Sequence, residues 1–165
     1  MDESTFRDLY EESYDRLVGQ VGAMTGSFGE AEDFVQEAFV RAWDHRRSLR
    51  SRPEAESWIR TSAYRLFISR YRRSKLFGRH ADRSIAPPAP AEPNPDRIAV
   101  VRALQTLPVE QRQALVLFHL ADLSIAEIAA ETGSPEGTVK ARLSRGRAAL
   151  ATHLTDTLPE EALHV

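Results

Sequence analysis

The sequence predicts an all-α protein built from two small helical domains that are joined by a proline-rich linker. Apolar residues recur at helical spacing in both halves of the chain, and no strand-like alternation between turn signals is present. Five of the nine prolines fall within residues 84–97. Because proline lacks an amide donor and restrains the preceding residue to extended conformations, this segment is expected to be neither a helix nor a central strand. The predicted domains are therefore residues 1–83 and 98–165, with residues 84–97 as a flexible linker.

Three helices are expected in the first domain. The first ends at Gly26, which can adopt a left-handed turn, and the second follows Ser27, whose hydroxyl has capping-box spacing with Glu30. The third begins near Pro53, since proline fits the first helical position, and ends in the basic run of residues 70–73. The apolar stripes expected to face the core are Phe6, Leu9, Tyr10, Leu17, Val18 and Val21, then Ala31, Val35, Ala38, Phe39, Ala42 and Trp43, and finally Trp58, Ile59, Ala63 and Leu66.

The second domain is expected to contain a helix-turn-helix. A short helix is predicted over residues 98–104, and Pro108 opens another. Ser124 and Glu127 form a second capping-box pattern, and Gly133 can supply the left-handed residue of a short turn. The rest of the pattern consists of Ser134 as a cap, Pro135 at the first helical position, and Ile125, Ile128, Ala129, Val139 and Leu143 as residues that can bury one another.

The composition excludes several classes of protein. Cysteine is absent, which excludes disulfides, thiolate nucleophiles and thiolate zinc sites. No run approaches the roughly 20 apolar residues of a membrane-spanning helix, and the chain does not open with a signal peptide. We therefore expect a cytoplasmic protein without membrane insertion. The composition indicates no cofactor or metal, and it places an enzymatic function at a disadvantage.

The net charge of −2 hides a strong segregation of charge along the chain. Residues 1–45 contain 11 acidic and 3 basic side chains, whereas residues 46–83 contain 3 acidic and 12 basic ones. Residues 138–154 contain 4 basic side chains and no acidic one. This asymmetry favours a polyanionic partner and leaves an acidic face for another purpose. The alternative is a set of solvated helix faces that attract each other.

Residues 134–147 are the first candidate for DNA binding. A helix enters the major groove when its exposed face carries hydrogen-bond donors and a partner helix fixes its angle. The side chains at suitable spacing are Thr138, Lys140, Ala141, Ser144 and Arg145, with Arg142 beside them. The alternative is an ordinary helical hairpin with a basic solvent face.

The stretch from His45 to Arg73 is a second candidate. Aromatic rings beside cations suit unstacked bases, because the rings stack and the cations hold the backbone. Trp58 lies on the apolar stripe with Ile59, which favours packing for this ring. The loop contains Arg46, Arg47, Arg50 and Arg52 around Leu49, and the helix that follows alternates Trp58, Tyr64, Phe67 and Tyr71 with Arg60, Arg65, Arg70, Arg72 and Arg73.

An acidic cluster precedes this stretch, and its members are Glu30, Glu32, Asp33 and Glu37. Clustered carboxylates hold the metals of some nucleases. Here they follow one another on a single predicted helix, without a convergent His or a second carboxylate helix. The pattern therefore favours a solvated or protein-binding face.

The motifs resemble those of a known family. Residues 31–43 (AEDFVQEAFVRAW) resemble the region-two helix of bacterial sigma factors of the extracytoplasmic-function (ECF) type. Residues 107–115 and the helix-turn-helix that ends at residues 137–147 resemble region four of the same family. The order of the two motifs, their spacing and the linker between them agree with the family pattern, and the resemblance covers about residues 5–152.

The resemblance implies a subunit that recruits core RNA polymerase to promoter DNA and that an anti-sigma factor commonly silences. Asp33, Gln36, Glu37 and Arg41 would face the clamp helices of the large polymerase subunit. The minus-ten element would be bound by the loop that contains Arg46, Arg47, Leu49, Arg50 and Arg52, which captures a flipped base, and by Arg60, Tyr64, Arg65, Arg72 and Arg73 on the following helix. The minus-thirty-five element would be read by Thr138, Lys140, Ala141, Arg142, Ser144 and Arg145.

The sequence departs from the family pattern at two places, and two alternative functions remain open. Family members often carry Ile-Ala-x-Asn where this chain has residues 62–65, and Asp where it has Ser69. The minus-ten sequence that this chain would read is therefore left open. One alternative is a conventional dimeric helix-turn-helix regulator. The other is a metal-dependent nucleic-acid enzyme that uses the acidic helix.

Overall fold

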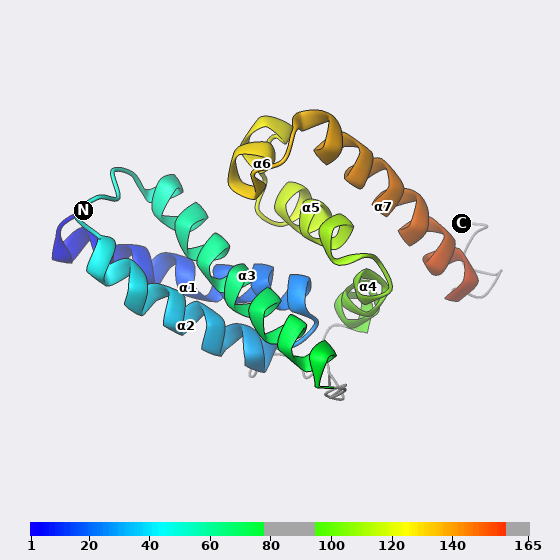
Figure 1. Ribbon diagram of the computed structural model, residues 1–165, viewed down its shortest axis with the longest axis horizontal. Coiled ribbons are helices and arrows are strands. Elements are labelled where there is room, and N and C mark those ends of the chain that lie inside the picture. The colour runs from blue at the N-terminus through cyan, green and yellow to red at the C-terminus, as the bar shows by residue number, and fades with distance from the viewer. Residues whose placement is uncertain (78–94, 158–165) are drawn as a thin grey trace. The chain divides into compact units, whose positions relative to one another are not determined.

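The computed structural model describes residues 1–77 and 95–157, and these residues form seven helices and no strand (Figure 1). The chain divides into two compact units, Met1–Ala91 and Glu92–Val165. The prediction of an all-α fold with two small helical domains is confirmed. Within the described part of the chain, no helix combines the length and the apolar character that crossing a membrane requires.

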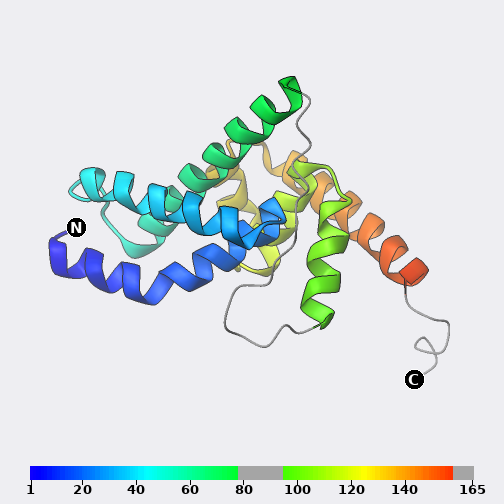
Figure 2. The ribbon, with the colours of Figure 1, turned by 90° about the horizontal axis from the view of Figure 1, so that it is seen from below.

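The first unit consists of α1 (Glu3–Thr25), α2 (Phe28–His45) and α3 (Arg52–Leu76). The first two helices run side by side in opposite directions (Figure 2), and α3 packs against both. The predicted stripes lie in the core with few exceptions: Tyr10 is exposed, and Trp43, Trp58 and Leu66 are half-buried. The largest apolar side chains that are fully buried here are Leu9, Leu17, Met24 and Ile59.

Gly26 and Ser27 act at the helix ends as predicted, whereas the cap at Ser51 was not predicted. Gly26 ends α1 in the left-handed conformation (φ 79°). The Ser27 hydroxyl accepts a hydrogen bond from the Glu30 amide at 3.3 Å, while the Glu30 carboxylate lies 3.6 Å from Arg70 Nε. Ser51 caps α3 in the same way as Ser27 caps α2, by accepting from the Glu54 amide.

The second unit consists of α4 (Pro95–Gln105), α5 (Val109–His119), α6 (Ile125–Thr132) and α7 (Glu136–Thr157). The prediction that residues 84–97 contain no helix is wrong at its end, because α4 begins at Pro95, where the fixed φ of proline suits a first helical position. The remaining residues of that predicted linker, 84–94, lie outside the described residues.

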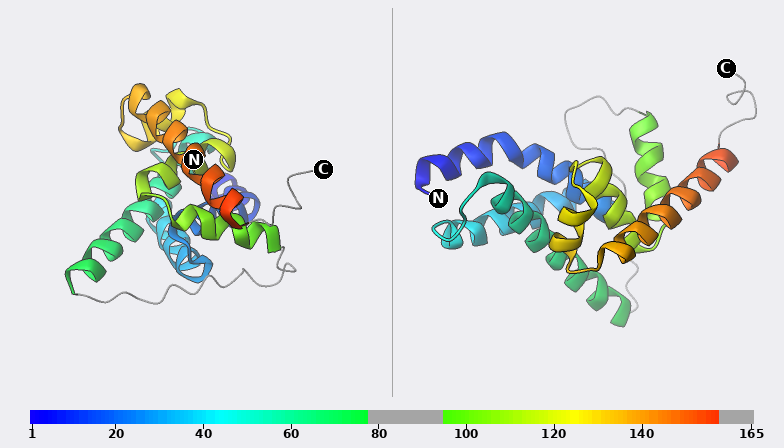
Figure 3. Two further views of the ribbon diagram at one scale, coloured as in Figure 1. Left: turned by 90° about the vertical axis from the view of Figure 1, so that its right-hand side faces the viewer. Right: turned by 90° about the horizontal axis from the view of Figure 1, so that it is seen from above.

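The helix-turn-helix forms as the sequence predicts. Ser124 and Glu127 make both halves of a capping box, and Gly133 ends α6 at φ 65°. Figure 3 shows that α7 continues from this turn as one long helix. A Cβ atom on Gly146 would lie 2.8 Å from Leu115 Cδ1, so the missing side chain lets α7 approach α5 closely.

A buried arginine holds α4 against α5. Arg112 Nε donates to the Leu104 carbonyl at 3.0 Å, and its Nη2 donates to the Leu107 carbonyl at 3.1 Å. These carbonyls belong to the end of α4 and the turn after it, where fewer backbone donors are available than inside a helix. Arg112 therefore satisfies the backbone where the chain changes direction.

We expect Arg112→Met to destabilise the second unit by about 1–3 kcal/mol, because buried carbonyls lose a charged donor. Both tryptophans of the chain, Trp43 and Trp58, lie in the first unit. Part of the unfolding transition followed by far-ultraviolet circular dichroism should therefore move to a lower urea concentration. The transition followed by tryptophan fluorescence, which reports the first unit, should keep its midpoint. Arg102→Met, on the exposed side of α4, is the matched control. Equal unfolding curves for the two variants would contradict the role of Arg112.

Candidate nucleic-acid and protein interfaces

The outer face of α2 is acidic and exposed. Asp33, Gln36, Glu37 and Arg41 all lie on it, opposite the buried stripe of the same helix. Arg41 forms an ion pair with Glu37 one turn earlier, and Gln36 Nε2 donates to the Tyr14 hydroxyl on α1 at 3.2 Å. Among the residues that the structure describes, no three His, Asp or Glu side chains converge on a position that could hold a metal ion. The face therefore presents separate charges and hydrogen-bonding groups to a partner.

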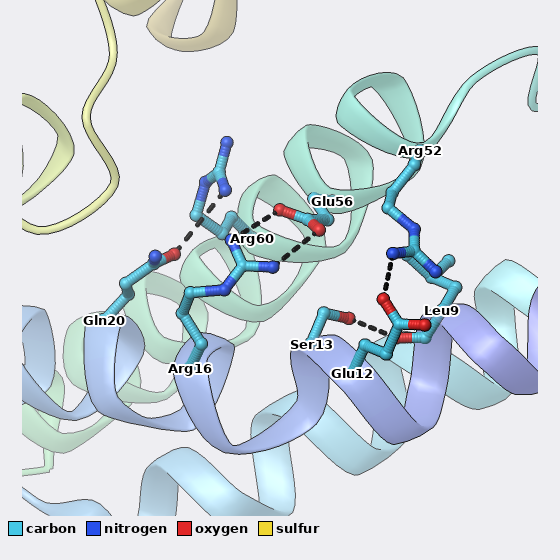
Figure 4. Close-up of polar contacts among 8 residues, drawn as sticks. All are labelled: Leu9, Glu12, Ser13, Arg16, Gln20, Arg52, Glu56 and Arg60. Atoms are coloured by element: carbon cyan, nitrogen blue, oxygen red, sulfur yellow. Dashed lines mark hydrogen bonds and ion pairs between the residues drawn. The ribbon is translucent and has the colours of Figure 1, made fainter.

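The loop after α2 presents only part of its predicted DNA-binding set. Arg47 and Arg50 are exposed. The Arg46 guanidinium is held over the Trp43 ring at 3.8 Å and donates to the Trp43 carbonyl at 2.7 Å. The Arg52 guanidinium pairs with Glu12 of α1, and the hydrogen bond between them lowers the pKa of the Glu12 carboxyl and raises the pKa of Arg52 (Figure 4). Arg46 in the loop and Arg52 at the start of α3 are thus engaged within the protein.

Leu49, which lies in the same loop, is buried within the first unit, with its side chain only 4% exposed. Its amide donates to the Arg46 carbonyl at 3.2 Å in the turn of the loop. In the free chain the loop therefore exposes Arg47 and Arg50, and the assignment of Leu49 to the minus-ten element stays a prediction.

Arg60 on α3, another residue predicted to bind the minus-ten element, is also buried and only 4% exposed. Its Nη1 lies 3.5 Å from Gln20 Oε1 of α1, next to a bidentate pair in which Arg16 donates to both Glu56 oxygens at 2.9 and 2.8 Å (Figure 4). Arg60 is therefore part of a polar seam between α1 and α3, and in this structure it is not presented to DNA.

The remaining predicted residues of α3 are accessible. Arg65, Arg72 and Arg73 are exposed, and Tyr64 is half-buried, with its ring 6.0 Å from that of Phe67. These side chains give α3 a basic outer surface that continues to the end of the helix.

A pocket of about 310 Å³ opens between α2 and α3. The rings of His45 and Trp58 lie 5.4 Å apart in its wall. From the sequence, Arg41 and Arg65 were predicted to lie on different surfaces and Trp58 was predicted to pack in the core, while the other lining residues were not predicted. The available signal was helical spacing, which puts the lining residues on one face of each helix: Arg41, Asp44 and His45 on α2, and Trp58, Ser62 and Arg65 on α3.

The second helix of the helix-turn-helix presents its central side chains outward. Lys140, Ser144 and Arg145 are exposed, while Thr138 and Ala141 are half-buried. The sixth predicted residue, Arg142, donates from Nη1 to the Ser134 hydroxyl at 3.0 Å and so braces the turn. Beyond this face, the Arg147 guanidinium lies 5.0 Å from the centre of the Phe118 ring on α5.

Known proteins share both the sequence and the fold. Residues 9–77 match the model of sigma-70 region 2, and residues 97–150 match that of sigma-70 region 4. The ECF RNA polymerase sigma factor SigM of Mycobacterium tuberculosis strain H37Rv is 34% identical over 160 residues, which cover 91% of this chain and 77% of the relative. The corresponding values for SigW of Bacillus subtilis are 28% identity over 171 residues, with 94% and 91% covered.

A solved structure extends this similarity to three dimensions. The sigma factor RpoE of Bartonella quintana, in complex with the anti-sigma factor NepR, superimposes with a TM-score of 0.80 at 25% identity and covers 93% of this chain and 99% of its own. With two family regions in the expected order and identity over nearly its whole length, the chain belongs to the ECF family of RNA polymerase sigma factors.

Proposed function

We propose that this chain binds core RNA polymerase through the outer face of α2 and directs it to promoters by reading a minus-ten element with the first unit and a minus-thirty-five element with the second. No covalent chemistry is required of the chain, and it acts as a non-enzymatic initiation subunit in the cytoplasm. The complex of the Bartonella relative with an anti-sigma factor supports control by a partner of the same kind.

The observation that carries this proposal is that the first unit exposes acidic side chains on one helix and basic side chains on another. The exposed side chains of α2 include Glu32, Asp33 and Glu37, while those of α3 include Arg65, Arg72 and Arg73. A dimeric operator-binding protein has no use for two such faces on a unit separate from its helix-turn-helix. A factor that holds a protein with one face and nucleic acid with the other requires both.

For the minus-ten element, we assign strand binding to the exposed Arg47, Arg50, Arg65, Arg72 and Arg73, and base capture to the pocket between α2 and α3. Unstacking a base costs a few kcal/mol, which stacking in a pocket offsets in part. The volume of about 310 Å³ falls in the range of small-ligand sites, and the Trp58 ring supplies an aromatic wall.

For the minus-thirty-five element, we assign base and phosphate contacts to Lys140, Ser144 and Arg145, with Thr138 and Ala141 at the edge of the contact and Arg142 bracing the turn. Arginine and lysine recognise guanine in the major groove through two acceptors, and serine adapts to several bases. Because the two units are joined, engagement of one raises the effective concentration of the other at its own element.

Run-off transcription with purified core polymerase tests the proposal as a whole. Addition of the chain should produce transcripts with a defined start from a subset of promoters. A polymerase-independent footprint on a palindromic site would favour the dimeric regulator instead. Cleavage of nucleic acid that stops when Glu32, Asp33 and Glu37 are neutralised would favour the nuclease.

Arg145→Ala should weaken initiation by the equivalent of about 1–3 kcal/mol at promoters that depend on the minus-thirty-five element, because one exposed base-reading cation is lost. Initiation should change little at a promoter in which that element is scrambled. Arg102→Ala, an exposed arginine of the same unit, controls for the loss of one positive charge. If Arg145→Ala weakens initiation equally at both promoters, the assignment to this element fails.

Trp58→Ala should weaken promoter opening through the loss of stacking, by about 1–3 kcal/mol. The test is a double-mutant cycle in the holoenzyme, with probes in which each minus-ten position of the non-template strand in turn is replaced by an abasic site. At the captured position, the abasic site and Trp58→Ala should each weaken binding of the holoenzyme to the probe. The two changes together should weaken it little more than either change alone, because both remove the same stacking contact. Full additivity at all positions would reject the pocket as the site of base capture.

A further inference from the structure

The wall of the pocket between α2 and α3 contains a carboxylate and a guanidinium that do not pair. Asp44 lies on α2 and Arg65 lies on α3, and both line the pocket. Within residues 1–77 and 95–157, neither side chain forms an ion pair or a hydrogen bond, although their charges are opposite. The two groups are therefore held apart in one pocket, and each can bond to a molecule that enters it.

The other polar groups of the wall differ in how far the protein already uses them. The Arg41 guanidinium pairs with Glu37 on the same helix. The Ser62 hydroxyl has no hydrogen-bond partner in the part of the chain that the structure describes. The rings of His45 and Trp58, 5.4 Å apart, form the aromatic part of the wall. The unused hydrogen-bonding capacity therefore comes mainly from one carboxylate, one guanidinium and one hydroxyl.

This set of groups distinguishes thymine from the other bases. An ionised carboxylate only accepts hydrogen bonds, and a guanidinium only donates them. Adenine, cytosine and guanine each carry an exocyclic amino group that donates and other edge atoms that accept. Thymine has no amino group, and its ring N–H lies between two carbonyl oxygens that would repel a carboxylate. A base that stacks on Trp58 can therefore satisfy both Asp44 and Arg65 if it carries an amino group, whereas thymine leaves the carboxylate without a good donor.

We propose that Asp44 is a specificity-determining residue of the pocket. Its carboxylate accepts a hydrogen bond from the exocyclic amino group of the captured base, while Arg65 donates to an acceptor on the same base. The pocket thereby selects an amino-bearing base against thymine at one position of the minus-ten element. This inference rests on the proposed function, and it names the class of base that the pocket takes.

The test uses the holoenzyme that this chain forms with core polymerase and fork DNA with a single-stranded minus-ten segment on the non-template strand. Each of the four bases is placed in turn at the captured position, which the double-mutant cycle with Trp58→Ala identifies. The wild-type holoenzyme should bind the best amino-bearing base roughly tenfold more tightly than thymine. Most of this loss should also follow when that base is replaced by a counterpart without the amino group, which is uracil for cytosine and hypoxanthine for a purine.

Asp44→Asn should reduce the preference to within about threefold, because the amide of asparagine can also donate to a carbonyl oxygen. Asp44 is exposed, so this variant is expected to fold. Asp8→Asn, which removes an exposed carboxylate from α1 of the same unit, is the matched control and should keep the full preference.

The outcomes separate the inference from the proposed function. Equal binding of thymine and the amino-bearing bases by the wild type, or an undiminished preference in Asp44→Asn, would overturn the role of Asp44 and leave base capture intact. Full additivity of Trp58→Ala with the abasic site at every position would reject base capture by this pocket, and the role of Asp44 with it. Failure of the wild-type chain to form a holoenzyme that binds the fork DNA would reject the proposed function itself.

Discussion

The packing of α1 against α2 determines what the rest of the first unit can do. Ala31, Val35, Ala38 and Ala42 commit one side of α2 to the core, and their small size brings the helices close. The other side must then face outward, whatever charge it carries. Since α3 packs against the same pair, its basic surface is carried on the same rigid body as the acidic one. The acidic face of α2, proposed to bind a protein, and the basic face of α3, proposed to bind nucleic acid, thus arise from a single core.

Arginine has two distinct uses in this chain. Arg16, Arg52 and Arg112 make ion pairs or carbonyl contacts that hold helices and turns in place. Arg47, Arg72 and Arg145 are exposed on the surfaces assigned to DNA. The guanidinium group suits both purposes, because its planar set of donors satisfies several acceptors at once whether these are backbone carbonyls, carboxylates or phosphates. A count of basic residues therefore overstates the surface available for a polyanion.

Local patterns predicted most of the fold, and tertiary packing explains most of what they missed. Capping at Ser27, Ser51 and Ser124 depends on residues three positions apart, so the sequence contains the whole signal. The burial of Arg60 involves contact with Gln20, 40 residues earlier in the chain, which no periodicity encodes. Helical spacing groups the lining residues of the pocket on one face of α2 and one face of α3, but it does not indicate that these two faces lie together. The start of α4 was predicted wrongly for a local reason, because proline is common both in linkers and at the first position of a helix.

The tight contact at Gly146 has a consequence for how new promoter preferences can arise. This glycine directly follows Arg145, and a side chain in its place would fit only if Leu115 moved. The close approach of α7 to α5 therefore favours glycine at position 146. Exchanges of the neighbouring exposed side chains of α7 leave this contact untouched, so the surface proposed to read DNA can vary while the packing of the helix is kept.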